Sequence, residues 1–137
     1  MKNRILSIAI LTAMCLIGST SYADEQPTLI KGYATAYNGP SEYTCTGDHV
    51  RKGICGGCSE YIGKTIVLYQ RLPNDEVGRI IGIYECLDTG TGTEAFQEGR
   101  LIDVWCEDLD ACQEFMNEVY ADGCQGKVFI QVMEAAG

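Results

Sequence analysis

Short β-like runs separated by turn residues constrain the fold of this 137-residue chain more than any other feature. Apolar and β-branched residues gather at 29–37, 65–70, 78–87, 102–105 and 127–132, and Gly, Pro and Asn lie between the runs. The turn at 72–76 joins two of the runs into a hairpin. Because closure removes exposed strand edges, we predict a mainly β fold, a small closed barrel of about six strands with one α-helix near the C-terminus.

The helix is expected between Asp108 and Gly123. Asp108 is a typical N-terminal cap, and Gly123 suits the C-terminal end. Between them, apolar side chains recur at helical spacing and are interpreted as core packing: Leu109, Cys112, Phe115, Met116 and Val119.

The first 23 residues are typical of a secretory signal peptide. Lys2 and Arg4 precede an apolar run at 5–17, and Ala23 ends a small-residue cleavage site. A lipid anchor on Cys15 would need a small residue before it, where Met14 stands. We therefore expect an exported protein, with a disordered stretch at 24–28, a single domain at 29–137 and no stable membrane insertion.

The chain is strongly acidic. Its formal net charge is −9, and removal of Lys2 and Arg4 with the signal peptide makes it −11. Such a surface repels nucleic acid, so we expect no nucleic-acid partner, whereas a neutral sugar polymer remains compatible.

Seven cysteines remain after residue 23, and in a small exported domain disulfides are the expected state. The odd number leaves at least one thiol free or paired between molecules. Candidate pairs are Cys112 with Cys124, and Cys45 with either Cys55 or Cys58.

Cys55 and Cys58 have the spacing of a redox or metal-binding pair, at the end of a long loop expected at 41–57. No helical pattern follows, as a redox motif would require. A zinc site would need a second pair, such as Cys45 with Cys86, and His49 is the only imidazole. Structural disulfides are the favoured interpretation, and neither a metal nor another cofactor is expected.

Two aspartates follow or lie within apolar runs. Asp88 ends the run at 78–87, Asp103 lies between Ile102 and Val104, and a Thr- and Gly-rich loop separates them. Partly buried carboxylates of this kind can serve as an acid/base pair. The competing interpretation is that they are ordinary turn and strand-end caps.

The order of four motifs resembles the three-aspartate (3D) domain family, found also at the C-terminus of membrane-bound lytic transglycosylase A and in stationary-phase survival proteins. The motifs are Ala34–Tyr37, Ile62–Ile66, Asp88–Gly90 and Ile102–Trp105. The resemblance spans roughly residues 32–132 and implies a double-psi β-barrel.

It also implies cleavage of peptidoglycan glycan strands between N-acetylmuramic acid and N-acetylglucosamine without water, giving 1,6-anhydro products. By this resemblance Asp103 is the acid/base, and Asp88 orients it or the sugar. Thr89 and Gly90 would contact substrate, and Tyr37 would either stack on a sugar or fill the barrel. No aspartate stands at the family's third position, where Glu60 is the nearest acid.

Two other functions remain open. The chain could be a non-catalytic peptidoglycan- or polysaccharide-binding barrel. Plant expansins resemble this case, because a similar barrel acts on polysaccharide there without obvious hydrolysis. It could also be a disulfide-rich interaction or inhibitor protein in which both aspartates are caps.

Overall fold

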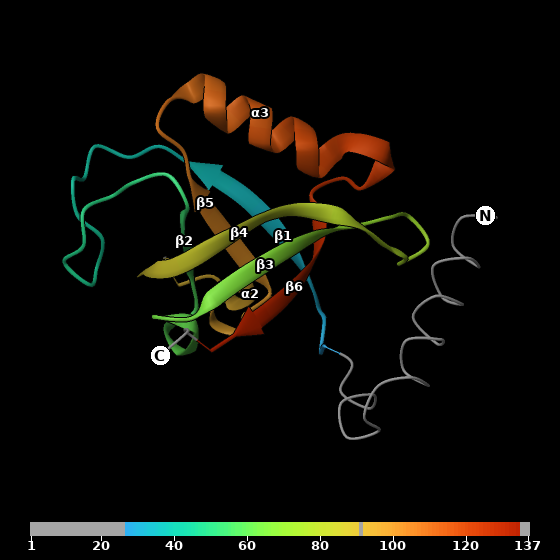
Figure 1. The fold of residues 1–137 in the computed structure, drawn as a ribbon, viewed down its shortest axis with the longest axis horizontal. Helices are drawn as coiled ribbons and strands as arrows, with labels where there is room; N and C mark the ends of the chain where they lie inside the picture. Colours follow the sequence, from blue (N-terminus) through green and yellow to red (C-terminus); the bar gives the residue numbers. More distant parts are fainter. Residues whose placement is uncertain (1–26, 91, 135–137) are drawn as a thin grey trace, which may run out of the picture.

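The fold is described by a computed structural model that covers residues 27–90 and 92–134. The predicted signal peptide, its cleavage site at Ala23 and residues 24–26 lie outside the described residues. Six strands close into a barrel in the order β1-β5-β2-β4-β3-β6 (Figure 1). Their bounds are β1 Ile30–Tyr37, β2 Ile54–Gly57, β3 Thr65–Arg71, β4 Val77–Thr89, β5 Leu101–Trp105 and β6 Lys127–Met133.

The barrel mixes parallel and antiparallel pairing. β1 runs parallel to β5, and β2 runs parallel to β4, whereas the other neighbours are antiparallel. The core within the wall includes Ile66, Leu68, Ile102 and Ile130, each with no exposed surface. The predicted mainly β barrel of about six strands is thus confirmed.

The hairpin predicted from the turn at 72–76 is also confirmed. β3 and β4 pair antiparallel from Thr65 opposite Glu85 to Arg71 opposite Val77, with two register shifts. In β3 the apolar residues Ile66, Val67 and Leu68 are buried. β4 is the longest strand and continues beyond β3 to reach β2, so one strand links the hairpin to the rest of the barrel.

The helix α3, Leu109–Tyr120, lies across one side of the barrel (Figure 1). Asp108 caps it as predicted, since its carboxylate accepts a hydrogen bond from the Ala111 amide at 2.8 Å. Val119 is fully buried, but Leu109 is 77% exposed, so its assignment to the packed stripe was wrong. A 3-10 turn, η3 Ala121–Gly123, follows and ends at Gly123 with a φ of +76°.

The long loop expected at 41–57 contains a strand, and that part of the prediction was wrong. Residues 54–57 form β2, and all four are buried. Its sequence, Ile-Cys-Gly-Gly, offers little β propensity, so pairing with β4 and β5 on both sides decides its conformation. Two further short elements were not predicted: η2 Ser59–Tyr61 and α2 Glu94–Gln97.

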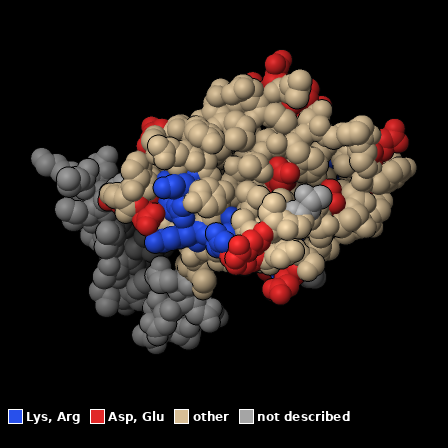
Figure 2. Space-filling model, turned by 180° about the vertical axis from the view of Figure 1, so that it is seen from behind, with Lys and Arg blue, Asp and Glu red and all other residues tan. Residues whose placement is uncertain are grey.

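Most lysine and arginine side chains among the described residues lie in ion pairs. Lys31 and Arg71 both approach Asp75, at 2.9 Å and 3.7 Å, and Arg79 binds Glu118 at 2.7 Å. Figure 2 shows the lysine and arginine side chains of one face gathered in a single patch, with acidic groups around it. Exposed pairs of this kind contribute little net stability.

Within the described parts of the chain, every helix is too short or too polar to cross a membrane.

Candidate functional site

Strand β2 brings the two predicted aspartates together. Its residue Gly56 pairs with Asp103 of β5 on one side and with Asp88 of β4 on the other. On the far side of β5, Asp103 pairs in turn with Thr35 of β1. Four neighbouring strands therefore contribute to one site, which we call the aspartate site and define by Thr35, Tyr37, Gly56, Asp88 and Asp103.

Asp103 occupies a partly buried position. Its neighbours Ile102 and Val104 are 0% and 4% exposed, and strand alternation turns the Asp103 side chain to the opposite face. The Thr35 hydroxyl donates a hydrogen bond to its carboxylate at 2.8 Å. Burial raises the pKa of Asp103 above its usual range; the Thr35 hydrogen bond opposes that shift and the charge of Asp88 adds to it. A raised pKa suits a carboxyl group that donates a proton.

Asp88 is held by three donors instead of one. The Tyr37 hydroxyl donates to one carboxylate oxygen at 3.1 Å. The backbone amides of Cys45 and Thr89 donate to the other oxygen, at 3.1 and 3.0 Å. These contacts fix the orientation of Asp88, which suits a positioning group better than one that must exchange a proton.

Tyr37 reaches the aspartate site with its hydroxyl. Burial, together with the charge of Asp88 and the hydrogen bond to it, raises the pKa of Tyr37 well above its ordinary value. The phenol therefore stays protonated and remains a donor at neutral pH. Its ring is half-buried, and stacking on a sugar stays a prediction.

Gly56 keeps the space beside the two carboxylates free of a side chain. A β-carbon built there would meet only backbone atoms, 3.6 Å from the Asp88 oxygen and 3.8 Å from the Asp103 oxygen. Directly opposed residues of neighbouring strands face the same side of a sheet, so such a carbon would lie on the Asp103 side. Added volume at position 56 would therefore lie between the two strands that carry the aspartates.

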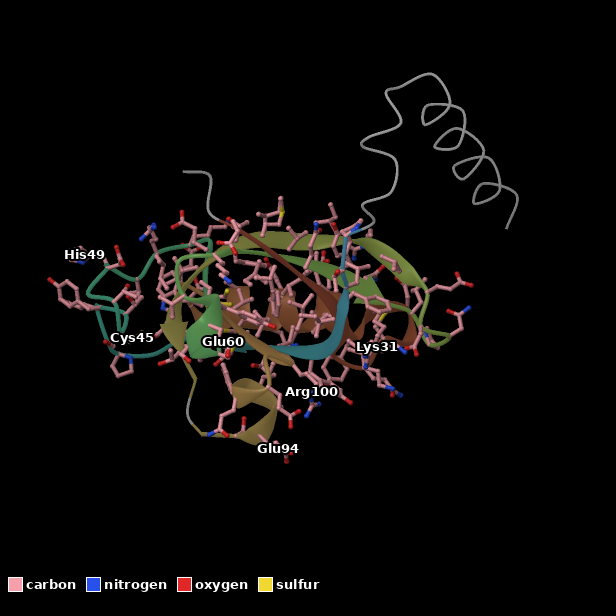
Figure 3. All side chains as sticks on the ribbon, turned by 90° about the horizontal axis from the view of Figure 1, so that it is seen from below. Lys31, Cys45, His49, Glu60, Glu94 and Arg100 are labelled. Carbon is pink, nitrogen blue, oxygen red and sulfur yellow. The ribbon has the colours of Figure 1, made fainter. Side chains whose placement is uncertain are left out.

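The other predicted site residues lie at its edge or away from it. Thr89 is exposed and contributes its backbone amide to Asp88. Gly90 lies against the Phe96 ring, where a β-carbon would overlap the ring, so packing explains this glycine. Glu60 is exposed on η2, and no hydrogen bond or ion pair among the described residues joins it to either aspartate (Figure 3). Substrate contacts of Thr89, Gly90 and Glu60 stay predictions.

Three contributors to the site were not predicted. Gly56 belongs to β2, which was expected to be part of a loop. Thr35 stood within the motif Ala34–Tyr37, but its pairing with Asp103 joins residues 68 positions apart. Cys45 contributes its backbone amide from a loop that projects at one end of the barrel, where Figure 3 labels Cys45 and His49. Neither contact follows from local sequence.

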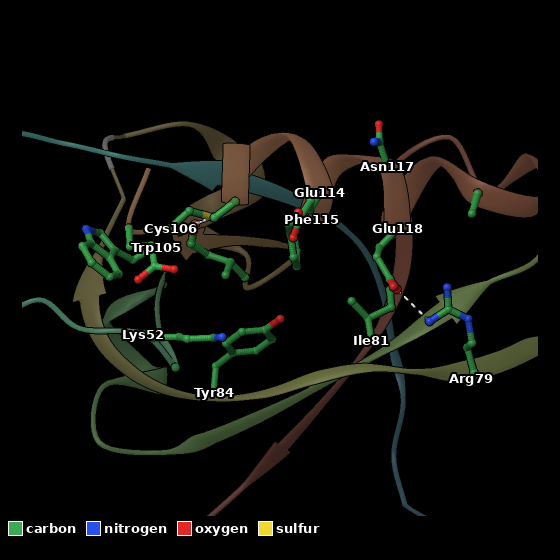
Figure 4. Close-up of a pocket in the computed structure, with 15 residues that line it drawn as sticks. Lys52, Arg79, Ile81, Tyr84, Trp105, Cys106, Glu114, Phe115, Asn117 and Glu118 are labelled. Carbon is green, nitrogen blue, oxygen red and sulfur yellow. Dashed lines mark hydrogen bonds and ion pairs between the residues drawn. The ribbon is translucent and has the colours of Figure 1, made fainter. Parts of the chain in front are cut away.

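The described cavity lies elsewhere. It measures about 830 Å³ and opens between β4, the end of β5 and α3, with Tyr84, Trp105 and Phe115 among its lining and the Arg79–Glu118 ion pair at one end (Figure 4). Tyr84 and Phe115 meet edge to face at 6.4 Å between ring centres. Neither aspartate lines this cavity.

The cysteines are unbonded in the structure. All seven described cysteines are free thiols, so neither the Cys112–Cys124 pair nor a bond from Cys45 to Cys55 or Cys58 is present. Cys112 instead lies close to the Cys106 thiol, and Cys45 contacts the Leu87 carbonyl oxygen. Helix geometry explains the first difference, because Cys112 lies in the first turn of α3 and Cys124 beyond its far end.

No cluster of three or more His, Cys, Asp or Glu side chains among residues 27–90 and 92–134 could hold a metal ion.

Comparisons with known proteins add no assignment. No family model matches the chain, and no curated protein matches it.

Proposed function

We propose that the protein cleaves peptidoglycan glycan strands as a lytic transglycosylase, with Asp103 as the acid/base. The observation that carries this proposal is the position of Asp103: partly buried, bound by Thr35 at 2.8 Å, and with a pKa raised by burial beside a second aspartate. The motif order that resembles the 3D domain family supports the same assignment.

In the proposed reaction, protonated Asp103 donates its proton to the glycosidic oxygen, and the bond to C1 of N-acetylmuramic acid breaks. The resulting carboxylate then takes the proton of the substrate's own 6-hydroxyl as that oxygen attacks C1. The residue returns to its starting state and no water is consumed. One carboxyl group is sufficient because the nucleophile belongs to the substrate, unlike ordinary glycosidases with two catalytic carboxylates.

The remaining residues of the aspartate site position these groups. Asp88, fixed by three donors, would orient the sugar or act on Asp103 through its charge. Gly56 would hold the two aspartate-bearing strands side by side. A site in the barrel wall also suits a long polymer, which could not enter a closed pocket. The signal-like residues 1–23 support export to the cell envelope, where this substrate lies.

The test is incubation of the purified chain with isolated peptidoglycan and mass spectrometry of the soluble products. We expect products one water mass lighter than hydrolysed muropeptides, and a loss of at least about 100-fold in Asp103→Asn. Asp110→Asn, an exposed carboxylate in the first turn of α3, is the matched control and should keep full activity. Protein bound to the pellet without product would instead favour a non-catalytic glycan-binding barrel.

A further inference from the structure

Two buried thiols face each other across the strands that build the aspartate site. Cys55 on β2 and Cys86 on β4 both have 0% exposure and belong to the hydrophobic core. They are direct partners in the parallel pairing of β2 with β4. Neighbouring strands lie about 4.8 Å apart, which falls within the Cα separations that a disulfide spans.

The two thiols also interact. Interaction with the neighbouring Cys86 thiol, together with burial, raises the pKa of the Cys55 thiol. Thiolates are the attacking groups in disulfide exchange. The contact, the strand register and the burial all single out the same two residues.

We propose that Cys55 and Cys86 form a disulfide that locks β2 to β4 beside the aspartate site. A disulfide-bearing oxidant, either a small molecule such as oxidised glutathione or a protein thiol–disulfide oxidoreductase, accepts the two electrons. One of the two thiolates attacks that oxidant, and the other then displaces it from the mixed disulfide. One S–S bond breaks and one forms, and the two protons leave with the reduced oxidant. Because both thiols are buried once the barrel closes, this exchange takes place before closure.

The bond would fix the register where it most affects the site. The β2–β4 pairing shifts between Cys55 and Gly56, so that Gly56 lies opposite Asp88 and not Leu87. A bulge of this kind allows alternative registers, and a covalent bond one residue away holds a single one. The bond itself does not depend on the proposed function; only its consequence for activity rests on that proposal.

Cys58 is the competing partner. Its side chain is buried, with 9% exposure. Burial chiefly raises the pKa of Tyr61, and Cys58 and Cys86 both add to that shift, so the three residues lie near one another. The strand register nevertheless places Cys55 opposite Cys86, whereas Cys58 lies beyond the end of β2. The two candidates are therefore separable by substitution.

The experiment is to reduce and unfold the full chain, refold it in a glutathione redox buffer, block free thiols and digest with trypsin. Cleavage after Lys52, Lys64, Arg79 and Arg100 yields a fragment 53–64 with Cys55 and Cys58, and a fragment 80–100 with Cys86 as its one cysteine. We expect these fragments to be linked in the wild type and in Cys58→Ser, and unlinked in Cys55→Ser. Unlinked wild-type fragments, or a link that survives Cys55→Ser and disappears in Cys58→Ser, would overturn the proposal.

Thermal unfolding supplies a second readout. Closing a loop of about 30 residues should make the Tm of the oxidised wild type at least about 8 °C higher than in reductant. The Cys55→Ser/Cys86→Ser double variant should show no such dependence, and an equal change in that variant would contradict the assignment. Both measurements use no glycan, so a failure of glycan cleavage would leave this result unaffected.

Discussion

The Tyr37 hydroxyl on β1 donates a hydrogen bond to the Asp88 carboxylate on β4 at 3.1 Å, although β5 and β2 separate these strands in the barrel order. Asp103 belongs to β5 and Gly56 to β2, so the contact connects the two strands that flank them. It places the Tyr37 phenol, two carboxylates and Gly56 in one region of the barrel wall.

Tyr37→Phe should lower the free energy of unfolding by about 1–2 kcal/mol, because Asp88 loses one of three donors while the ring is kept. Urea unfolding monitored by circular dichroism measures the change. Tyr120→Phe is the control, since Tyr120 is 57% exposed, and should change stability by less than about 0.5 kcal/mol. Equal effects of the two substitutions would show that the Asp88 contact is not stabilising.

Asp103→Asn should stabilise the folded state at neutral pH and have little effect at low pH. Burial raises the folded-state pKa of Asp103 above its unfolded value, so its neutral form favours folding. The stability that neutral Asp103 contributes is fully present below the pKa of aspartate in the unfolded chain, about 4. It is lost as the pH rises through the pKa of Asp103 in the folded protein. Asparagine cannot ionise and avoids this loss.

Unfolding free energies of the wild type and Asp103→Asn, measured from pH 3 to pH 8, check this pH dependence. The advantage of the variant should grow with pH and then level off above the folded-state pKa. A difference that is constant with pH, or that shrinks as pH rises, would contradict the raised pKa.

Gly56→Ala should leave stability within about 1 kcal/mol of the wild type and reduce glycan cleavage at least 10-fold. Its new β-carbon makes ordinary backbone contacts at 3.6 and 3.8 Å but adds bulk between the two strands that carry the carboxylates. Gly57→Ala is the matched control on the next residue. There a β-carbon would meet the Cys86 sulfur and the Tyr61 ring at 3.2 Å, so it should cost about 1–3 kcal/mol.

Stability and activity assays of both variants separate space at the site from packing in the core. A Gly56→Ala variant with normal cleavage would show that the sugar does not use the position beside the carboxylates. That result would leave Asp103 as a candidate but remove Gly56 from the proposed site.

Asp108→Ala should lower the free energy of unfolding by about 1 kcal/mol, because the Ala111 amide loses its acceptor at the start of α3. Asp110→Ala, in the same first turn, removes a similar charge without that cap and should cost less than about 0.5 kcal/mol. Chemical denaturation compares the two. Equal costs would mean that charge near the helix end, and not the hydrogen bond, stabilises α3.

The sequence by itself determined the features that depend on neighbouring residues. The hairpin of β3 and β4 follows from two β-like runs around a turn, and the start of α3 follows from the Asp108 cap. Asp88 and Asp103 could be selected because each is a carboxylate beside a buried apolar run. In each case the necessary information lies within about a dozen residues, where local geometry sets the outcome.

Only the tertiary structure decided how these pieces meet. Strand β2 has too little intrinsic β preference to be recognised, and β4 and β5 impose its conformation from outside. The same pairing places Gly56 between the aspartates and Cys55 opposite Cys86, and β1 brings Thr35 to Asp103. Such contacts join residues about 30 to 70 positions apart, and their register depends on barrel closure, which no local pattern encodes.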